Sequence, residues 1–565
     1  MSGALGICIE NDVPVPMRDG VILRANVFRP ETDGEFPGLL LRTPYGKPTS
    51  GQERYVRAGY AVVTMDSRGR YASEGDYVPF TVEHTGDSED GYDSVEWLAE
   101  QPFCNGKVGT FGASYNAWMQ WMLARTRPPH LVAMAAWSIP IELTEVDWPG
   151  AFKPARRIRW WRTTIAPDLR RRRGLPPPHT PAEASEIWDA VEHGKWLGFM
   201  PWLDATRYLP EGLAEYAKDW LEHPSRRPWQ FAENHQEVAV PNLDFSGWYD
   251  HCNGTMGHLP GMQKNGRTEL ARTQTKLVIG PWNHSMLGSR KLDEIDFGPQ
   301  AELDLQGMII RWFDHWLKGH DNGIESEPPV RYFVMGSGKW KNASTWPLKE
   351  TAERALFLSS EGRAGRADGG GKLSWDQSET LSKESYIYDP NDPVPTLWTR
   401  NLFSMPSNRR RLENREDILY YRSTPLEEEV EVVGYPEVVL YASSSAPDTD
   451  FFARLVDENP DGPALEVCYG LVRARHRHSY DREDFLTPGK VTEFRIQLGA
   501  TGCRFQKGHH IRLEITSSDF PNHDRNHNTG RNDLADTELV SARQEVHHSK
   551  THSSQLILPV DEKAQ

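Results

Sequence analysis

Short apolar runs alternate with turns and helical stretches in the first quarter of the chain. The runs at 38–42 (GLLLR) and 61–66 (AVVTMD) are apolar almost throughout, as strands buried on both faces of a parallel sheet are. Two more such runs lie at 108–111 and 131–136, and 90–100 (DGYDSVEWLAE) has the spacing of an amphipathic helix. Strands and helices in alternation predict a doubly wound α/β sheet.

The pattern changes near Glu145. Residues from about 147 to 239 are rich in Trp, Arg and Pro and have almost no strand-like run, but helical spacing recurs, for example at 213–222. The α/β pattern returns with 241–250 (PNLDFSGWYD) and 276–282 (KLVIGPW). We therefore predict a helical segment inserted into an α/β domain that continues after it.

Beyond about residue 348 the chain becomes rich in short alternating segments. A glycine-rich loop comes first, and strand-like segments follow at 430–433, 437–442, 451–456, 491–498, 510–515 and 555–558. Many short strands with turn residues between them are typical of a β-sandwich or jelly roll. The last third of the chain is therefore predicted to form a separate β domain.

Length, composition and charge limit the classes of function. A chain of 565 residues exceeds the roughly 250–300 residues that one core supports, and 38% hydrophobic with 25% charged residues is the balance of a folded protein. The net charge of −16 argues against sequence-independent nucleic-acid binding, which needs a basic surface. The arginine run 170–173 is the local exception, either as a solvated helix face or as a site for an anionic substrate.

The sequence gives no sign of membrane insertion, export or a resident cofactor. It has no run of about 18–20 apolar residues, and its first twenty residues lack the basic and apolar stretches of a signal peptide. The five cysteines are far apart without a CxxC pair, and no phosphate-binding glycine motif follows a strand. We expect a cytoplasmic protein with no metal and no cofactor.

The sharpest local signal for chemistry is the run 107–115 (KVGTFGASY). An apolar strand leads into small residues around Ser114, and a helix-like run, 116–124, follows. A serine on such a strand-to-helix turn is the nucleophile of α/β-hydrolases, and the helix N-terminus directs the Tyr115 N–H toward a developing oxyanion. Alone the motif is weak, because a structural turn uses the same residues and Asn116 replaces the usual second glycine.

A nucleophilic serine needs a base, and the base needs an orienting carboxylate. In this fold they follow in the order Ser, Asp or Glu, His, each at the end of a later strand. Asp250 follows the strand-like run 243–247, and His284 follows the run 276–280. Each could be an ordinary turn or capping residue, but the three together, in order and at strand ends, are much more specific for a catalytic triad.

Motifs spread over nearly the whole chain carry a family resemblance. They are VPMRDGVIL (15–23), RTPYGK (42–47), DSRGRYASEG (66–75), GTFGASY (109–115), GWYD (247–250), GPWNHS (280–285), SSSAPDTDF (443–451) and SSDFPNHDRN (517–526). The chain resembles the cocaine-esterase-like serine hydrolases, which are related to X-prolyl dipeptidyl aminopeptidases and α-amino-acid ester hydrolases. The resemblance implies an α/β-hydrolase core in 1–145 and 241–352, a helical cap in 146–240 and a C-terminal jelly-roll β-sandwich in 353–565.

The resemblance also implies a role for each residue of the catalytic site. Ser114 is the expected nucleophile, Asp250 the orienting acid and His284 the base. Tyr45, the tyrosine of the RTPYGK run, is the expected donor to the oxyanion beside the Tyr115 N–H.

Substrate contacts are implied at the entry of the cap and on a jelly-roll loop. They are Trp148, Leu402 and Phe403, although ordinary packing between domains would explain these apolar residues equally well. The chain departs from the family at Cys252, a position that is often aromatic in the cocaine-cleaving enzyme. This departure bears on the acyl specificity and leaves the triad intact.

The sequence therefore predicts a serine hydrolase that cleaves a small carboxylic ester through an acyl-enzyme. One alternative is amide chemistry, as an X-prolyl dipeptidyl peptidase or an acylase. The other is a non-catalytic carbohydrate-binding protein with a jelly roll, against which the intact triad argues. The sequence names no particular ester, and it leaves open whether the chain forms a homodimer.

Overall fold

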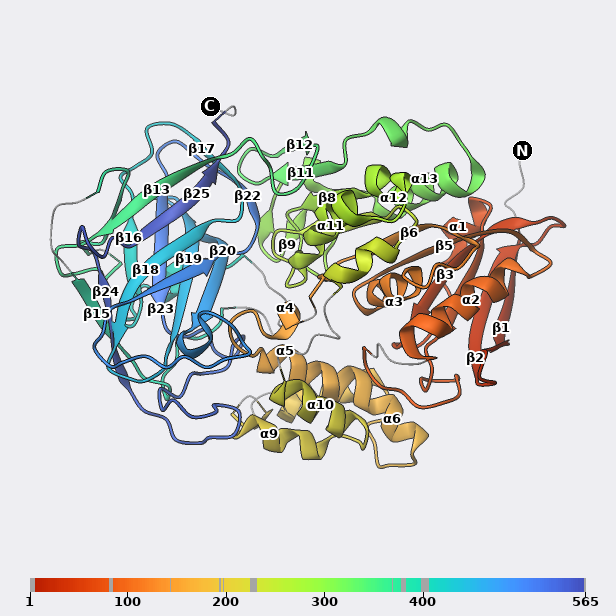
Figure 1. Cartoon of the computed structure of the whole chain (residues 1–565), viewed down its shortest axis with the longest axis horizontal. Helices are drawn as coiled ribbons and strands as arrows, with labels where there is room; N and C mark the ends of the chain where they lie inside the picture. The colour runs from red at the N-terminus through yellow and green to blue at the C-terminus, as the bar shows by residue number, and fades with distance from the viewer. Residues whose placement is uncertain are drawn as a thin grey trace.

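The apolar runs near the N-terminus form a six-stranded sheet in the computed structural model of the chain (Figure 1). Its order is β1-β2-β4-β3-β5-β6, built from β1 (Ile7–Pro16), β2 (Ile22–Pro30), β3 (Phe36–Thr43), β4 (Ala61–Asp66), β5 (Cys104–Ala113) and β6 (Leu131–Trp137). The strands β3 to β6 are parallel, and β1 and β2 add an antiparallel hairpin at one edge. The structure describes residues 6–80, 85–142, 144–192, 195–196, 198–223, 231–367, 369–377, 383–397 and 406–562.

Helices cover both faces of this sheet, as predicted. Successive residues of a strand point to opposite faces, and Leu39 of β3 belongs to a different hydrophobic cluster from Leu40. One cluster contains the helices α2 (Asp90–Ala99) and α3 (Tyr115–Ala124), and the other contains α1 (Glu53–Arg57) and α13 (Leu305–Lys318). No helix among the described residues is long and apolar enough to cross a membrane.

A second sheet of the core continues from β6. It has the order β12-β11-β8-β7, from β7 (Leu243–Gly247), β8 (Lys276–Gly280), β11 (Val330–Val334) and β12 (Lys339–Ala343), and the first three are parallel. Asn242, just before β7, joins the two sheets through its side chain. The side-chain oxygen accepts from the Ala136 N–H at 2.8 Å, and the side-chain amide donates to the Ala136 carbonyl at 2.9 Å. The helices α11 (His258–Asn265) and α12 (Glu269–Gln274) connect β7 to β8.

The segment between β6 and β7 is helical wherever it forms a regular element among the described residues. Its helices are α4 (Thr144–Asp147), α5 (Pro154–Arg159), η2 (Trp160–Ile165), α6 (Ala166–Arg172), α7 (Pro181–Ile187), η3 (Trp188–Glu192), α9 (Trp202–Ala205), η4 (Thr206–Tyr208), α10 (Leu213–Glu222) and η6 (Ala232–Glu237). Helix α10 buries Leu213, Ala217 and Trp220, whose spacing gives one apolar face. In Figure 1 these helices form a cap beneath the core and the β domain.

The arginine run 170–173 ends α6 and contacts the core. Arg172 Nη1 donates to the carbonyls of Tyr71 (3.0 Å) and Ser73 (2.9 Å), and Arg171 pairs with Asp168 at 2.7 Å. Asp168 in turn accepts from the Tyr71 N–H at 2.9 Å. The run therefore fastens the cap to a loop of the core at the surface.

The C-terminal strands form one hydrogen-bonded, almost wholly antiparallel network. They are β13 (Ala352–Ser359), β14 (Lys372–Ser374), β15 (Lys383–Tyr388), β16 (Leu419–Arg422), β17 (Val430–Gly434), β18 (Glu437–Ser444), β19 (Asp450–Glu458), β20 (Ala464–Arg473), β21 (Thr492–Gln497), β22 (Thr501–Phe505), β23 (His510–Thr516), β24 (Ala542–His547) and β25 (Gln555–Val560). Its hydrophobic core is continuous with Ile279 and Phe333 of the second core sheet and with Trp248, the residue that follows β7. The predicted domain boundaries stay predictions.

Candidate active site

Ser114 stands at a strained turn between β5 and α3. Its φ of 59° and ψ of −125° lie in a region that non-glycine residues adopt only when the surroundings enforce it. Two residues earlier, a Cβ on Gly112 would lie 2.8 Å from the Cβ of Asn116. The turn thus needs glycine at 112, because the Asn116 side chain occupies the space that a side chain at 112 would take.

The start of α3 is held by buried polar contacts. Tyr115 is the first residue of the helix, so its N–H has no acceptor within the helix. Its hydroxyl accepts from the Phe80 N–H and lies 3.3 Å from Asp87 Oδ2, which also accepts from Trp118 Nε1 at 3.1 Å. Burial raises the pKa of Asp87 to about 7. These contacts fix the direction of the Tyr115 N–H, the expected second donor to an oxyanion.

Asp250 and His284 follow adjacent strands and meet beyond the strand ends. Gly247 of β7 pairs with Gly280 of β8, and a Cβ on Gly247 would lie 2.1 Å from the carbonyl oxygen of Trp282. This close approach brings the two following loops together. His284 Nδ1 lies 2.9 Å from Asp250 Oδ1, a buried oxygen.

The environment of His284 favours its charged form. Burial lowers the pKa of His284, but the Asp250 carboxylate, with Cys252 acting in the same direction, outweighs burial and raises the pKa from 6.5 to about 10. Asp250 Oδ1 also accepts from the Cys252 N–H at 2.8 Å. The carboxylate therefore accepts hydrogen bonds from both neighbours and orients the imidazole with Nδ1 as the donor.

Ser114, His284 and Tyr45 line one cavity of about 280 Å³. Burial raises the pKa of Tyr45, so its hydroxyl keeps its proton at neutral pH and is able to donate. The rest of the described lining is Phe80, Ile139, Val146, Arg156, Arg157, Trp160, Thr164, Trp220 and Cys252. The two arginines and two tryptophans come from the cap, and sequence reasoning missed them, because no spacing within the cap shows which side of α5 faces the core.

Of the three predicted substrate contacts, only Trp148 lies among the described residues. Trp148 does not line this cavity: its ring centroid lies 5.1 Å from that of Phe152, and its carbonyl accepts from the Tyr480 hydroxyl of the β domain at 2.7 Å. Leu402 and Phe403 lie outside the described residues. The Trp148 ring thus packs within the hydrophobic cluster shared by cap and core, and its backbone carbonyl contacts the β domain.

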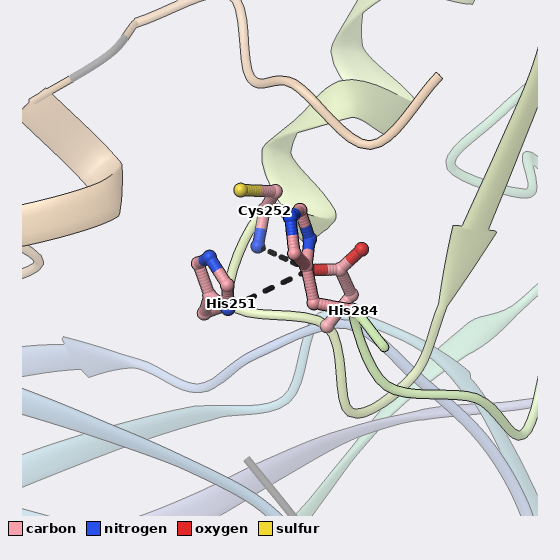
Figure 2. Close-up of side chains that lie close together, drawn as sticks. His251, Cys252 and His284 are labelled. Atoms are coloured by element: carbon pink, nitrogen blue, oxygen red, sulfur yellow. Dashed lines mark hydrogen bonds and ion pairs between the residues drawn. The ribbon is translucent and has the colours of Figure 1, made fainter. Parts of the chain in front are cut away.

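Figure 2 shows a cluster of metal-ligating groups around the base. Ligand atoms of Asp250, His251, Cys252 and His284 lie within 4.8 Å of one another. Burial lowers the pKa of His251 well below its usual value, so its ring is neutral. Nitrogen, sulfur and carboxylate donors are those that Zn²⁺ takes. A cation held here would occupy His284 and Asp250 and so block them as base and orienting acid.

Comparison with known proteins identifies the family of the chain. Residues 19–286 match the model of the X-Pro dipeptidyl-peptidase (S15) family, and residues 322–557 match that of the X-Pro dipeptidyl-peptidase C-terminal non-catalytic domain. The cocaine esterase of Rhodococcus sp. (strain MB1 Bresler) is 35% identical over 580 residues, covering 98% of each chain. The chain belongs to the cocaine-esterase family of serine hydrolases.

Solved structures confirm the fold of this cocaine-esterase family member. An aminopeptidase from a marine sediment archaeon, Thaumarchaeota archaeon, has a TM-score of 0.80 at 23% identity and covers 100% of this chain and 98% of its own. An α-amino-acid ester hydrolase has a TM-score of 0.78 at 22% identity, and the match covers 99% of this chain and 97% of the hydrolase. The family fold is thus the predicted α/β-hydrolase core with a helical insertion and a C-terminal β domain.

Proposed function

We propose that the protein is a carboxylic ester hydrolase that forms an acyl-enzyme on Ser114. The observation that carries the proposal is the His284–Asp250 contact of 2.9 Å beside a cavity that Ser114 and Tyr45 also line. The positive φ of Ser114 supports its role, because strain of this kind is typical of a nucleophile turn. The full-length likeness to a cocaine esterase supports ester chemistry.

Each group has a defined task in the proposed reaction. Asp250 accepts the Nδ1–H of His284, so the opposite ring nitrogen, Nε2, is the basic one. Nε2 takes the proton of the Ser114 hydroxyl while the serine oxygen bonds to the ester carbonyl carbon. The negative oxygen that results receives hydrogen bonds from the Tyr45 hydroxyl and the Tyr115 N–H.

The second half of the reaction uses the same groups. The tetrahedral intermediate collapses, the alcohol leaves with the proton from His284 Nε2, and the acyl group stays on Ser114. Nε2 then removes a proton from water, whose oxygen attacks the acyl carbon. The acid is released and the serine regains its proton from His284.

Peptide hydrolysis is the second candidate, because both matching family models bear the name of an X-Pro dipeptidyl-peptidase. Release of N-terminal dipeptides requires an anion to bind the substrate ammonium group. The charged side chains among the described lining of the cavity are Arg156, Arg157 and His284, which are basic. The charge of the cavity therefore favours an ester over a peptide with a free N-terminus.

We expect neutral 4-nitrophenyl esters of short acids to be hydrolysed with a kcat/KM at least about 100-fold above that for Xaa-Pro 4-nitroanilides. The physical reason is that the ammonium group of the peptide must enter a basic cavity without a partner. Steady-state kinetics on both panels, with fluorophosphonate labelling located at Ser114 by mass spectrometry, measures this. Efficient cleavage of the anilides with no ester turnover would transfer the assignment to the peptidase.

The pH dependence should reflect the raised pKa of His284. Below its pKa the imidazole holds a proton and cannot accept one from Ser114, so kcat/KM for a neutral ester should rise about tenfold per pH unit toward alkaline pH and level near pH 10. Cys252→Ala removes one of the groups that raise this pKa and should move the midpoint to lower pH. Initial rates corrected with the Ser114→Ala protein give the profile. A midpoint at or below 6.5 would contradict this account of His284.

A further inference from the structure

The cavity that holds the candidate nucleophile carries more positive than negative charge. Arg156 and Arg157 of α5 line it, and no carboxylate is among the described residues of its lining. Both arginines pair with the same buried carboxylate, Asp147: Arg156 Nη1 lies 2.8 Å from Oδ1, and Arg157 Nε pairs with Oδ2. Two guanidinium groups with one carboxylate leave one positive charge at the cavity wall.

A third cation lies one helical turn before Arg156. Lys153 is only 3% exposed and lines an adjoining cavity of about 580 Å³ together with Asp250 and His251. Burial and then the charge of Arg156 lower the pKa of Lys153 to about 8. Asp147 binds the arginines and Asp250 binds His284. The cavity of Lys153 is also lined by Glu466, which pairs with Arg454, and by Glu145, whose pKa burial raises to about 8.

Arg156 is the more exposed of the two arginines that line the catalytic cavity. Arg157 is held in place by Asp147 and by the face of Trp160, with its guanidinium carbon 4.6 Å from the ring centroid. Asp147 is also fixed by Trp220 Nε1, which donates to Oδ2 at 2.8 Å. The buried Nε atoms of both arginines make no hydrogen bond among the described residues, but the Arg156 side chain is 17% exposed and that of Arg157 only 4%.

A largely buried guanidinium group with an unpaired donor destabilises the folded protein unless an anion binds it. A buried donor without a partner costs free energy, and an unpaired buried charge costs more. A carboxylate matches the planar fork of arginine and would accept from Arg156. The cavity volume of about 280 Å³ is near the lower end of the roughly 300–1,000 Å³ of small-molecule pockets, so a short chain fits it.

We propose that the substrate is a small ester that also carries a carboxylate, which binds Arg156 inside the catalytic cavity. The proposal rests on the esterase function proposed above and specifies its substrate class. Lys153 and Arg157 add to the positive potential that attracts the anion. The carboxylate belongs to the acyl or to the alcohol part of the ester, and the two arms of the test separate these cases.

The test compares charged esters with uncharged analogues. The acyl arm uses 4-nitrophenyl hydrogen glutarate and 4-nitrophenyl methyl glutarate, and the alcohol arm uses 4-acetoxybutyrate and its methyl ester. We expect the wild-type protein to prefer the anion in one arm by about 10–100-fold in kcat/KM, the usual strength of a charge-assisted hydrogen bond. Arg156→Gln should remove this preference mainly through KM, and Arg156→Lys should restore part of it.

The controls separate this proposal from the esterase assignment. Arg170→Gln changes a cap arginine that hydrogen-bonds the Pro176 carbonyl and should keep the wild-type preference. If Arg156→Gln does not fold, inhibition of the wild-type protein by glutarate against neutral glutaramide decides the question, and stronger inhibition by glutarate is expected. Ser114-dependent turnover with equal or better use of both neutral esters overturns the anion proposal alone. Absence of Ser114-dependent turnover of any ester overturns the esterase assignment.

Discussion

Replacing Ser114 or His284 by alanine is expected to lower kcat for an aryl ester by about 10⁶, to the level of background hydrolysis. Ser114 supplies the attacking oxygen and His284 removes its proton, so neither step proceeds without the other. The double variant should lose little more than either single variant, because the two residues act as one unit. Initial rates at saturating ester for the three proteins measure the effect.

A matched control lies one residue beyond the base. Ser285 is exposed, and its backbone N–H donates to Asn283 Oδ1 at 3.0 Å. Its hydroxyl makes no hydrogen bond among the described residues. Ser285→Ala should therefore keep wild-type kcat and exclude a general effect of serine removal near the site. Thermal unfolding of each variant checks the fold. Near wild-type kcat in Ser114→Ala or in His284→Ala would remove that residue from the mechanism.

Tyr45→Phe is expected to lower kcat by about 10²–10³ with little change in KM, the usual cost of losing one oxyanion donor. The substitution removes one oxygen from a half-buried ring whose hydroxyl keeps its proton. The hydroxyl would act on the negative oxygen of the transition state more than on the neutral carbonyl of the substrate. Steady-state kinetics with a neutral aryl ester separates kcat from KM.

Tyr77→Phe is the control for this change. The ring of Tyr77 lies 6.5 Å from that of Tyr115, within the same aromatic group, but Tyr77 does not line the cavity. Its hydroxyl should be dispensable for kcat. If Tyr45→Phe instead raises KM and leaves kcat unchanged, Tyr45 contacts the bound substrate and the oxyanion has a different donor.

The core strands could be predicted because their burial is complete. All residues of β4 are buried, so the sequence 61–66 is apolar almost throughout, and the predicted bounds are those of the structure. The hairpin β1–β2 was not predicted. Most residues of β1 are exposed or half-buried, as on an edge strand, so its sequence lacks the alternation that marks a strand.

The candidate site could be predicted only where chemistry is tied to a strand end. Asp250 and His284 follow β7 and β8, and the structure places them 2.9 Å apart. Arg156 and Trp220 could not be found in this way, since they meet at the cavity through the packing of cap helices far apart in sequence. Trp148 was predicted to contact the substrate from its position at the cap entry, but its ring does not line the cavity.

The separate origin of the two halves of the cavity bears on how such proteins diversify. The groups proposed to carry out the reaction stand on the core, whereas Arg156, Arg157, Trp160 and Trp220 all belong to one uninterrupted insertion between β6 and β7. In the proposed mechanism, mutations in the insertion would alter which esters are accepted and would leave the bond-breaking groups in place. Substrate range and chemistry would therefore be encoded in separate stretches of the gene, so that one could change without the other.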